Sequence, residues 1–119
     1  MSSNSKVNVL FVCGRNQWRS PTAARVYRDD PRMNMRSAGL SEISRRRLSM
    51  KDLEWADWIF VMERKHRSRI HEQYRDLPKL PPIDSLDIPD AYSFMDSELV
   101  QLIRDATESQ WEIQGNSEQ

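Results

Sequence analysis

Short apolar runs rich in β-branched residues alternate along this chain with stretches that favour helices. Short strands are expected over Met33 to Ala38 and Ile83 to Ile88, in addition to the two apolar runs Val7 to Val12 and Trp58 to Met62. Such runs are typical of strands buried on both faces of a parallel sheet. Parallel strands need crossover connections, which are usually helices. The alternation therefore predicts an α/β fold, a three-layer sandwich with a four-stranded parallel sheet of the flavodoxin-like type.

Helix-start signals fall between these runs. Ser20 followed by Pro21 predicts an N-cap and a first helical position, with the helix ending near Asp29-Asp30-Pro31. Ser49 with Asp52 three residues later predicts a capping box. The last two helices are expected over 63–75 and after a cap at Asp96. The alternation of strands and helices is thus continuous along the chain.

The length of 119 residues fits one domain over 1–119, with a frayed tail from about residue 109. The 18 basic and 18 acidic side chains give a formal charge of zero, so we expect neither nucleic acid nor a membrane as partner. No apolar stretch fits a signal peptide or membrane span, and we expect a cytoplasmic monomer or weak dimer.

A polar loop with the sequence Cys13-Gly14-Arg15-Asn16-Gln17-Trp18-Arg19-Ser20-Pro21 joins the first strand to the first helix. It places a thiol at the strand end and a guanidinium just before a helix N-terminus. Loop N–H groups, the helix dipole and the arginine all suit a phosphate dianion above the sulfur. The same surroundings favour a thiolate, so Cys13 is a candidate nucleophile.

The sequence contains a single cysteine, so it has no internal disulfide and no multi-cysteine metal site. Most lone cysteines next to a buried strand are small hydrophobes that pack in a core. The context of Cys13 favours a reactive group instead, because this loop follows a buried strand at the edge where ligands bind in α/β folds.

The chain resembles the low-molecular-weight protein tyrosine phosphatase family. The resemblance lies in VLFVCGRNQWRSPTAARVYR, RSAG, DLEWADWIFVMERKH and LDIPDAY, and it spans residues 7 to about 106. It implies a phosphotyrosine protein phosphatase I-like fold that hydrolyses phosphomonoesters through a phosphocysteine, without a metal or other cofactor. The implied substrates are phosphorylated proteins or small phosphate esters.

The resemblance also implies roles for individual residues. Cys13 matches the nucleophile and Arg19 the phosphate-binding arginine. Asn16 and Ser20 match residues that shape the loop and hydrogen-bond the thiolate, and Ser37 matches a supporting serine. The remaining loop positions that would surround the phosphate are Gly14, Arg15, Gln17 and Trp18.

Cleavage of a phosphate ester through cysteine needs a proton donor for the leaving oxygen. The family uses an aspartate before the last helix, and Asp90 stands at that place. Asp87 is the alternative donor, and Asp90 could also be a surface turn residue. Tyr92 is expected to flank the pocket and stack on an aryl phosphate.

Two further readings of the function stay open. Arsenate reduction occurs on the same fold, and with one cysteine it would need an external thiol. The segment after Ser-Ala-Gly is compressed, so the chain could also be a phosphate- or phosphoprotein-binding regulator without catalysis. His66 and His71 are expected to be solvated side chains, and no metal site is expected.

Overall fold

A computed structural model of the chain describes residues 6–117. Its elements are, in order, β1 (Val7–Cys13), α1 (Arg19–Val26), β2 (Met33–Gly39), α2 (Met50–Trp55), β3 (Trp58–Val61), α3 (Arg64–Gln73), β4 (Ile83–Ser85) and α4 (Ser97–Ser117). The strands form one sheet in the order β2-β1-β3-β4, and every pair is parallel. This confirms the predicted α/β fold with a four-stranded parallel sheet.

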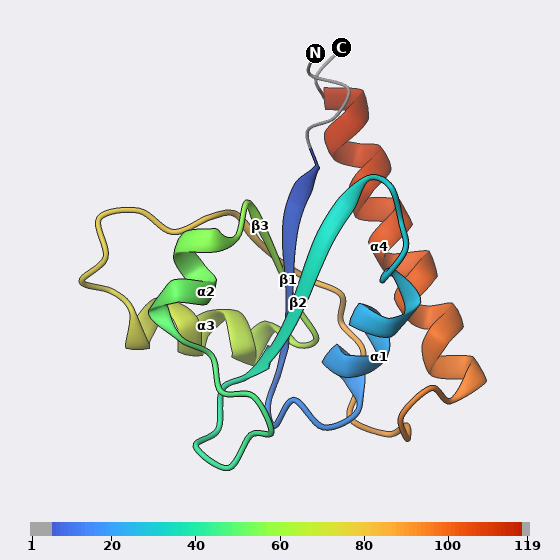
Figure 1. The fold of residues 1–119 in the computed structure, drawn as a ribbon, viewed down its shortest axis with the longest axis horizontal. Helices are drawn as coiled ribbons and strands as arrows, with labels where there is room; N and C mark the ends of the chain where they lie inside the picture. The colour runs from blue at the N-terminus through green and yellow to red at the C-terminus, as the bar shows by residue number, and fades with distance from the viewer. Residues whose placement is uncertain (1–5, 118–119) are drawn as a thin grey trace.

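Helices cover both faces of the sheet, α1 and α4 on one side and α2 and α3 on the other (Figure 1). Alternate strand residues point to opposite faces, and in the two central strands both sets are buried over 9–13 and 58–61, which is why these stretches are apolar. One cluster joins Val9, Phe11 and Phe60 to α1 and α4. The other joins Leu10 and Ile59 to α2 and α3.

The predicted helix caps are present at α2 and α4. The Ser49 hydroxyl accepts a hydrogen bond from the Asp52 N–H at 3.3 Å, and the Asp52 carboxylate accepts one from the Ser49 N–H at 3.1 Å. The Asp96 carboxylate accepts hydrogen bonds from the N–H groups of Glu98 and Leu99, at 2.9 and 3.4 Å. Each cap satisfies helix N–H groups that have no partner within the helix.

The tail that was expected to fray from about residue 109 is helical as far as Ser117, the end of α4, and residues 118–119 lie outside the described part of the chain. Trp111 stacks on Trp58 with ring centroids 5.3 Å apart, and the Arg32 guanidinium lies 4.9 Å from the Trp111 ring. Arg32 also bonds Glu108 of the same helix at 2.7 Å. These contacts hold the second half of α4 against the sheet.

The fourth strand is shorter than expected, ending at Ser85 rather than Ile88. The chain nevertheless stays beside β3, because the N–H groups of Leu86 and Ile88 donate to the carbonyls of Val61 and Met62, both at 2.8 Å. This path brings the segment after Ile88 to the carboxyl edge of the sheet. Among residues 6–117, no helix has the length and apolar character that crossing a membrane requires.

The chain reverses direction across the sheet at β1. It runs from β1 to β2 on one side, then crosses to β3 on the other side of β1. Such a switch point leaves a crevice at the carboxyl ends of the strands, where ligands of open α/β sheets bind. Cys13, the last residue of β1, lies at this switch point.

Candidate active site

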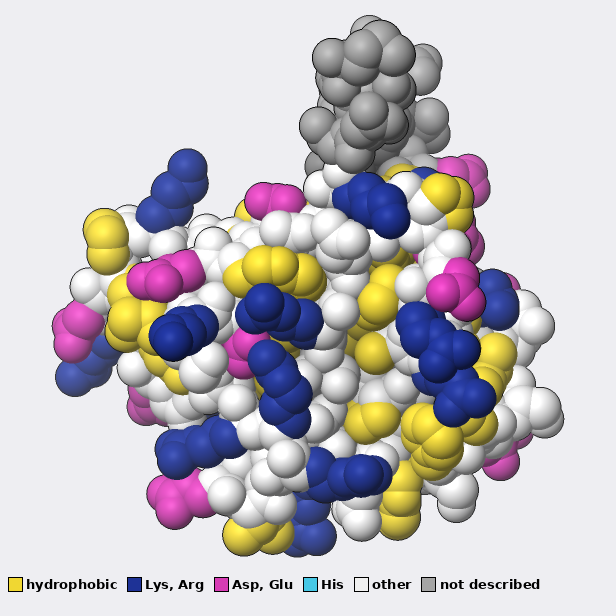
Figure 2. Space-filling view, in the orientation of Figure 1, with side chains coloured by type: hydrophobic (Ala, Val, Ile, Leu, Met, Phe, Trp, Pro, Cys, Tyr) yellow, Lys and Arg dark blue, Asp and Glu magenta, His cyan; other side chains and the backbone are white. Residues whose placement is uncertain are grey.

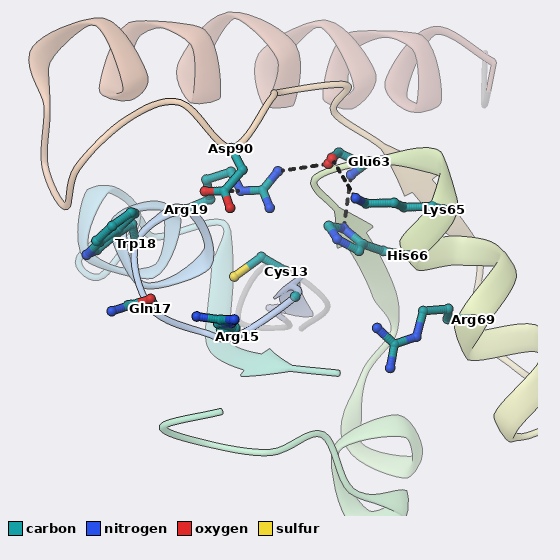
Figure 3. A pocket seen from close by; sticks show the side chains of 11 residues that line it. Cys13, Arg15, Gln17, Trp18, Arg19, Glu63, Lys65, His66, Arg69 and Asp90 are labelled. Atoms are coloured by element: carbon teal, nitrogen blue, oxygen red, sulfur yellow. Dashed lines mark hydrogen bonds and ion pairs between the residues drawn. The ribbon is translucent and has the colours of Figure 1, made fainter. Parts of the chain in front are cut away.

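The Cys13 sulfur lies at the floor of a cavity of about 520 Å³ (Figure 3). Cys13 is only 3% exposed, and its Sγ is 3.0 Å from the Ser20 hydroxyl and 3.2 Å from the Asn16 nitrogen, which donates to it. The Asn16 N–H donates to the sulfur, whereas the Ser20 hydroxyl has a single proton, which it can give either to a thiolate or to the Asn16 side-chain oxygen. Ser20 is therefore not an N-cap as predicted: α1 begins at Arg19, and the Ser20 side chain turns back to the sulfur.

The loop between β1 and α1 bends sharply at Asn16. This residue has a φ of 53°, in the left-handed region that asparagine tolerates better than most residues. Its side-chain oxygen accepts a hydrogen bond from the Ser20 hydroxyl at 3.0 Å. Asn16 thus fixes the turn with its backbone and anchors it to α1 with its side chain.

The remaining loop amides are free to bind an anion. Within residues 6–117, no protein acceptor is found for the N–H groups of Gly14, Arg15, Gln17 and Trp18. Gly14, Arg15, Gln17 and Trp18 all line the cavity above the sulfur. A ring of free N–H donors at the start of a helix is a common binding arrangement for phosphate.

The back of the loop is held by the segment that follows β2. The Gly14 carbonyl accepts hydrogen bonds from the Ser41 N–H at 2.8 Å and from the Ser44 hydroxyl at 3.3 Å. The predicted support from Ser37 is not seen: its carbonyl accepts from Arg46, and its hydroxyl makes no hydrogen bond within residues 6–117. Ser44 fills that supporting role instead.

Arg19 is buried beside the sulfur, with 4% of its surface exposed. One guanidinium nitrogen, Nη1, donates to the Ile88 carbonyl at 2.8 Å and lies 3.4 Å from a Glu63 oxygen, while Nε is 3.7 Å from Asp90. The Ile88 carbonyl ties Arg19 to the segment after β4. The guanidinium is thus held in place beside the sulfur before any ligand arrives.

Asp90 lines the cavity, and its side chain is 62% exposed at the cavity mouth (Figure 3). Asp87, the alternative proton donor, is not among the lining residues. Its carboxylate accepts from the Ser85 hydroxyl at 2.7 Å and pairs with Arg64 at 3.5 Å. Of these two aspartates, only Asp90 faces the sulfur-containing cavity.

The aromatic side chain at the cavity is Trp18 rather than Tyr92. Trp18 lines the cavity and is 41% exposed. Tyr92 packs against the hydrophobic cluster under α4, outside the cavity lining, and its hydroxyl donates to Glu98 at 3.0 Å. That hydrogen bond raises the pKa of Tyr92. The expectation that Tyr92 flanks the pocket is therefore not met.

Four lining residues were not predicted as site residues, and they come from α3 and the residue that caps it: Glu63, Lys65, His66 and Arg69. His66 is 2% exposed, so the expectation of a solvated side chain is wrong. Its Nδ1 accepts from the Glu63 N–H at 3.1 Å. Burial, and then the charge of Arg19, lower the pKa of His66 to about 4, so the imidazole is neutral at neutral pH. His71 is exposed, as expected.

The cavity thus combines a thiol, free N–H donors, a buried arginine and a carboxylate at the mouth. These are the groups that transfer of a phosphoryl group to sulfur requires. Within residues 6–117, no three His, Cys, Asp or Glu side chains are grouped so that they could hold a metal ion.

No protein-family model and no curated protein matches the sequence, but many solved structures share the fold. The YwlE arginine phosphatase from Geobacillus stearothermophilus is 24% identical, with a TM-score of 0.66 over 89% of this chain and 94% of that one. The low-molecular-weight protein tyrosine phosphatase SP-PTP from Streptococcus pyogenes is 20% identical, with a TM-score of 0.70 over 87% and 89%. The tyrosine phosphatase Wzb from Escherichia coli K30, solved with phosphate, is also 20% identical, with a TM-score of 0.67 over 91% and 98%.

Proposed function

We propose that this chain, which has the fold of the low-molecular-weight protein tyrosine phosphatases, hydrolyses phosphomonoesters through a phosphocysteine on Cys13. The observation that carries the proposal is the position of the buried sulfur. It lies 3.2 Å from a donating loop N–H, below further free N–H groups. Arg19 and Asp90 stand above it.

In the first step the Cys13 thiolate attacks phosphorus and the bond from phosphorus to the leaving oxygen breaks. The loop N–H groups and the Arg19 guanidinium bind the three equatorial oxygens, whose charge is greatest in the transition state. Asp90 gives its proton to the leaving oxygen. The products of this step are the free alcohol or phenol and phosphocysteine.

In the second step Asp90, now a carboxylate, takes a proton from water as the water oxygen attacks phosphorus. The phosphorus–sulfur bond breaks, which releases inorganic phosphate and restores the thiolate. The neutral His66 contributes no positive charge near Arg19, because its pKa of about 4 lies below the working range. The positive charge at the cavity therefore comes from its arginine and lysine side chains and from the loop dipoles.

Protein phosphotyrosine is the substrate that we propose. Trp18, 41% exposed at the cavity, offers an aromatic face on which a phenyl ring can stack. Trp18, rather than Tyr92, is then the residue that flanks the pocket and stacks on the aryl group of the substrate. Trp18→Ala should raise KM for phosphotyrosine peptides more than for a small alkyl phosphate.

Phosphoarginine is a second candidate substrate, favoured by one feature of the cavity. Two carboxylates, Glu63 and Asp90, line the wall around Arg19, and a leaving guanidine is a cation that a carboxylate binds well. One structural neighbour is described as an arginine phosphatase. Matched peptides carrying phosphotyrosine or phosphoarginine would assign the substrate through the ratio of their kcat/KM values.

The primary test is hydrolysis of p-nitrophenyl phosphate and phenyl phosphate in the presence of EDTA. Cys13→Ser should abolish turnover, and Asp90→Asn should lower kcat for phenyl phosphate about 10²- to 10⁴-fold. The loss with p-nitrophenyl phosphate should be smaller, because p-nitrophenolate leaves more readily without a proton.

Asp87→Asn is the matched control, since the same change is made three residues away on a carboxylate outside the cavity. It should retain wild-type turnover. Turnover that persists in Cys13→Ser would exclude the phosphocysteine, and equal losses in the two aspartate variants would exclude Asp90 as the specific acid.

A further inference from the structure

A second hollow, of about 650 Å³, lies on the other side of the loop from the sulfur. Its walls come from α1, from β2 and from the segment after β2. We call it the edge groove, and define it by Arg25 on α1, Arg28 in the turn after α1, Met35 on β2 and Arg45 on the segment after β2. Phe94, 45% exposed, closes one end.

The edge groove runs over the free edge of the sheet. Its lining includes Met35, Arg36 and Ser37, three consecutive strand residues. Consecutive side chains of a strand point to opposite faces of the sheet, so one hollow can touch all three only at the strand's edge. β2 is the outermost strand on this side: β1 pairs along its inner edge, and on the outer edge a bridge to Arg47 forms at Gly39, the last residue of the strand.

Backbone groups of β2 point into this groove. The Gly39 N–H donates to the Arg46 carbonyl, and the Gly39 and Ser37 carbonyls accept from Leu48 N–H and the Arg46 guanidinium, all at 2.8 Å. In a parallel strand, the N–H and C=O of one residue point the same way, and the direction alternates along the chain. Both backbone groups of Met35 and the N–H of Ser37 therefore face outward, away from β1.

The walls of the groove are strongly basic. Arg36 and Arg46 are committed to the buried carboxylate of Asp52, at 3.3 and 2.6 Å. Arg25, Arg28 and Arg45 are exposed, and the groove lining contains no acidic residue. Figure 2 shows this face, with Lys and Arg side chains gathered on both sides of a strip of apolar and uncharged surface.

We propose that the edge groove binds an extended acidic peptide segment, which adds a strand to the open edge of β2. The peptide backbone pairs with Met35 and Ser37. Its side chains alternate between the two walls, where carboxylates meet Arg25 and Arg28 on one side and Arg45 on the other. The site is distinct from the phosphate cavity and does not rest on the proposed phosphatase activity.

A peptide fits this site better than a nucleic acid. The floor is Met35 with Ala24, and the one exposed aromatic in the lining is Phe94, so successive bases would have no series of rings to stack on. The net charge of the chain is zero, so no general field gathers a polyanion. An open strand edge is by contrast specific for a polypeptide backbone.

The groove also touches the phosphate loop from behind. Asn16 and Pro21 line it, and the Asn16 N–H donates to the Cys13 sulfur. A segment bound along β2 thus lies against the residue that shapes the loop. An acidic stretch of a phosphoprotein that reaches this groove would be anchored beside the cavity.

The test uses a fluorescent seven-residue peptide, Val-Glu-Glu-Val-Glu-Glu-Val, which is long enough to pair with the open part of the β2 edge, from Met33 to the N–H of Ser37. Binding is followed by anisotropy and mapped by amide shifts of the ¹⁵N-labelled protein. Replacing all four glutamates with glutamine should weaken binding at least about tenfold. The largest amide shifts should fall on Met35 and Ser37.

Two further comparisons separate charge from strand pairing. The variant Arg25→Gln/Arg45→Gln should bind roughly fivefold to tenfold more weakly, whereas Arg75→Gln/Lys79→Gln, which changes two exposed cations outside the groove, should not. Methylation of alternate peptide nitrogens should abolish binding, because it removes the backbone donors.

Three results would overturn the proposal. Equal affinity for the N-methylated peptide would exclude strand addition, and equal affinity for the glutamine peptide would exclude the role of charge. Tighter binding of a uridine octanucleotide, with shifts at the same amides, would assign the groove to nucleic acid.

Discussion

Gly39→Ala should displace the phosphate loop, although the change adds a single methyl group outside the cavity. Gly39 ends β2, and its φ is not positive, so its backbone conformation is open to alanine. The constraint is space. A Cβ at this position would fall on the Ser44 hydroxyl and only 2.7 Å from both the Arg15 carbonyl carbon and the Asn16 nitrogen.

The size of the displacement follows from these distances. Ordinary contact begins near 3.4 Å, so the Arg15–Asn16 peptide must move by about 0.7 Å, the difference between 3.4 and 2.7 Å. The Asn16 N–H is the group that donates to the Cys13 sulfur at 3.2 Å. Because misplacing catalytic groups by about 1 Å can lower rates about 10²-fold, we expect kcat/KM to fall by roughly that factor.

The assay compares kcat/KM for p-nitrophenyl phosphate, vanadate affinity and urea unfolding. Overpacking of this kind lowers the free energy of unfolding by about 1–3 kcal/mol, which should leave the variant folded. In Gly39→Ala/Ser44→Gly the hydroxyl clash is gone but the two backbone contacts remain. That double variant should stay impaired.

Activity of Gly39→Ala within about twofold of wild type would refute the reasoning, because the loop would then tolerate the added methyl without losing its geometry. If Gly39→Ala/Ser44→Gly recovered full activity, the loss in Gly39→Ala would be due to the clash with the Ser44 side chain alone, and the argument from the two backbone contacts would be refuted. The single variant Ser44→Ala measures the separate effect of losing the 3.3 Å hydrogen bond to Gly14.

Three other predictions concern stability. Burial and Arg19 hold the His66 pKa near 4, while an unfolded histidine takes up a proton near pH 6.5; the free energy of unfolding should therefore fall by roughly 3 kcal/mol as pH drops from 6.5 to 4, and urea titrations of His66→Asn should lack that slope. Burial would raise the pKa of Asp52, but hydrogen bonds from Arg46 and Ser49 lower it. Ionised Asp52 should therefore contribute to the free energy of unfolding above about pH 4, and this contribution should disappear as the pH falls below that value. In Arg46→Gln the contribution should disappear at a higher pH. Trp111→Ala should lower Tm and cost about 1–3 kcal/mol, because Trp111 stacks on Trp58 at 5.3 Å; no change would indicate that the end of α4 does not contribute.

The strands and helix caps were predictable because their signals are local. An apolar run such as Val7 to Val12 is buried whichever helices cover it, and the Ser49 and Asp96 caps act on N–H groups two or three residues away. Cys13, Arg19 and Asp90 were predictable from the resemblance, and the structure brings the three to one cavity. Once the strand order is predicted correctly, the position of these three residues at one edge of the sheet follows.

The wrong predictions concern side chains whose main contact is with a residue that is distant in the sequence or on another element. Ser20 is an ordinary cap residue by sequence, but its hydroxyl is 3.0 Å from a sulfur seven residues earlier. His66 and Ile70 lie four residues apart on the same buried face of α3, a spacing that could have shown His66 to be inside. The end of α4 carries few apolar residues, and it is ordered by Trp58 and Arg32, which no local pattern reveals.

The left-handed turn at Asn16 has a consequence for how far sequences with this site can diverge. Glycine would accept the φ of 53° but would lose the oxygen that bonds Ser20. Aspartate would keep that oxygen but bring a negative charge next to the nucleophile. Asparagine alone meets both demands, whereas Gly14 and Gln17 offer the anion only backbone N–H groups. Selection for turnover from a randomised loop should therefore return asparagine at 16 and varied residues at 14 and 17.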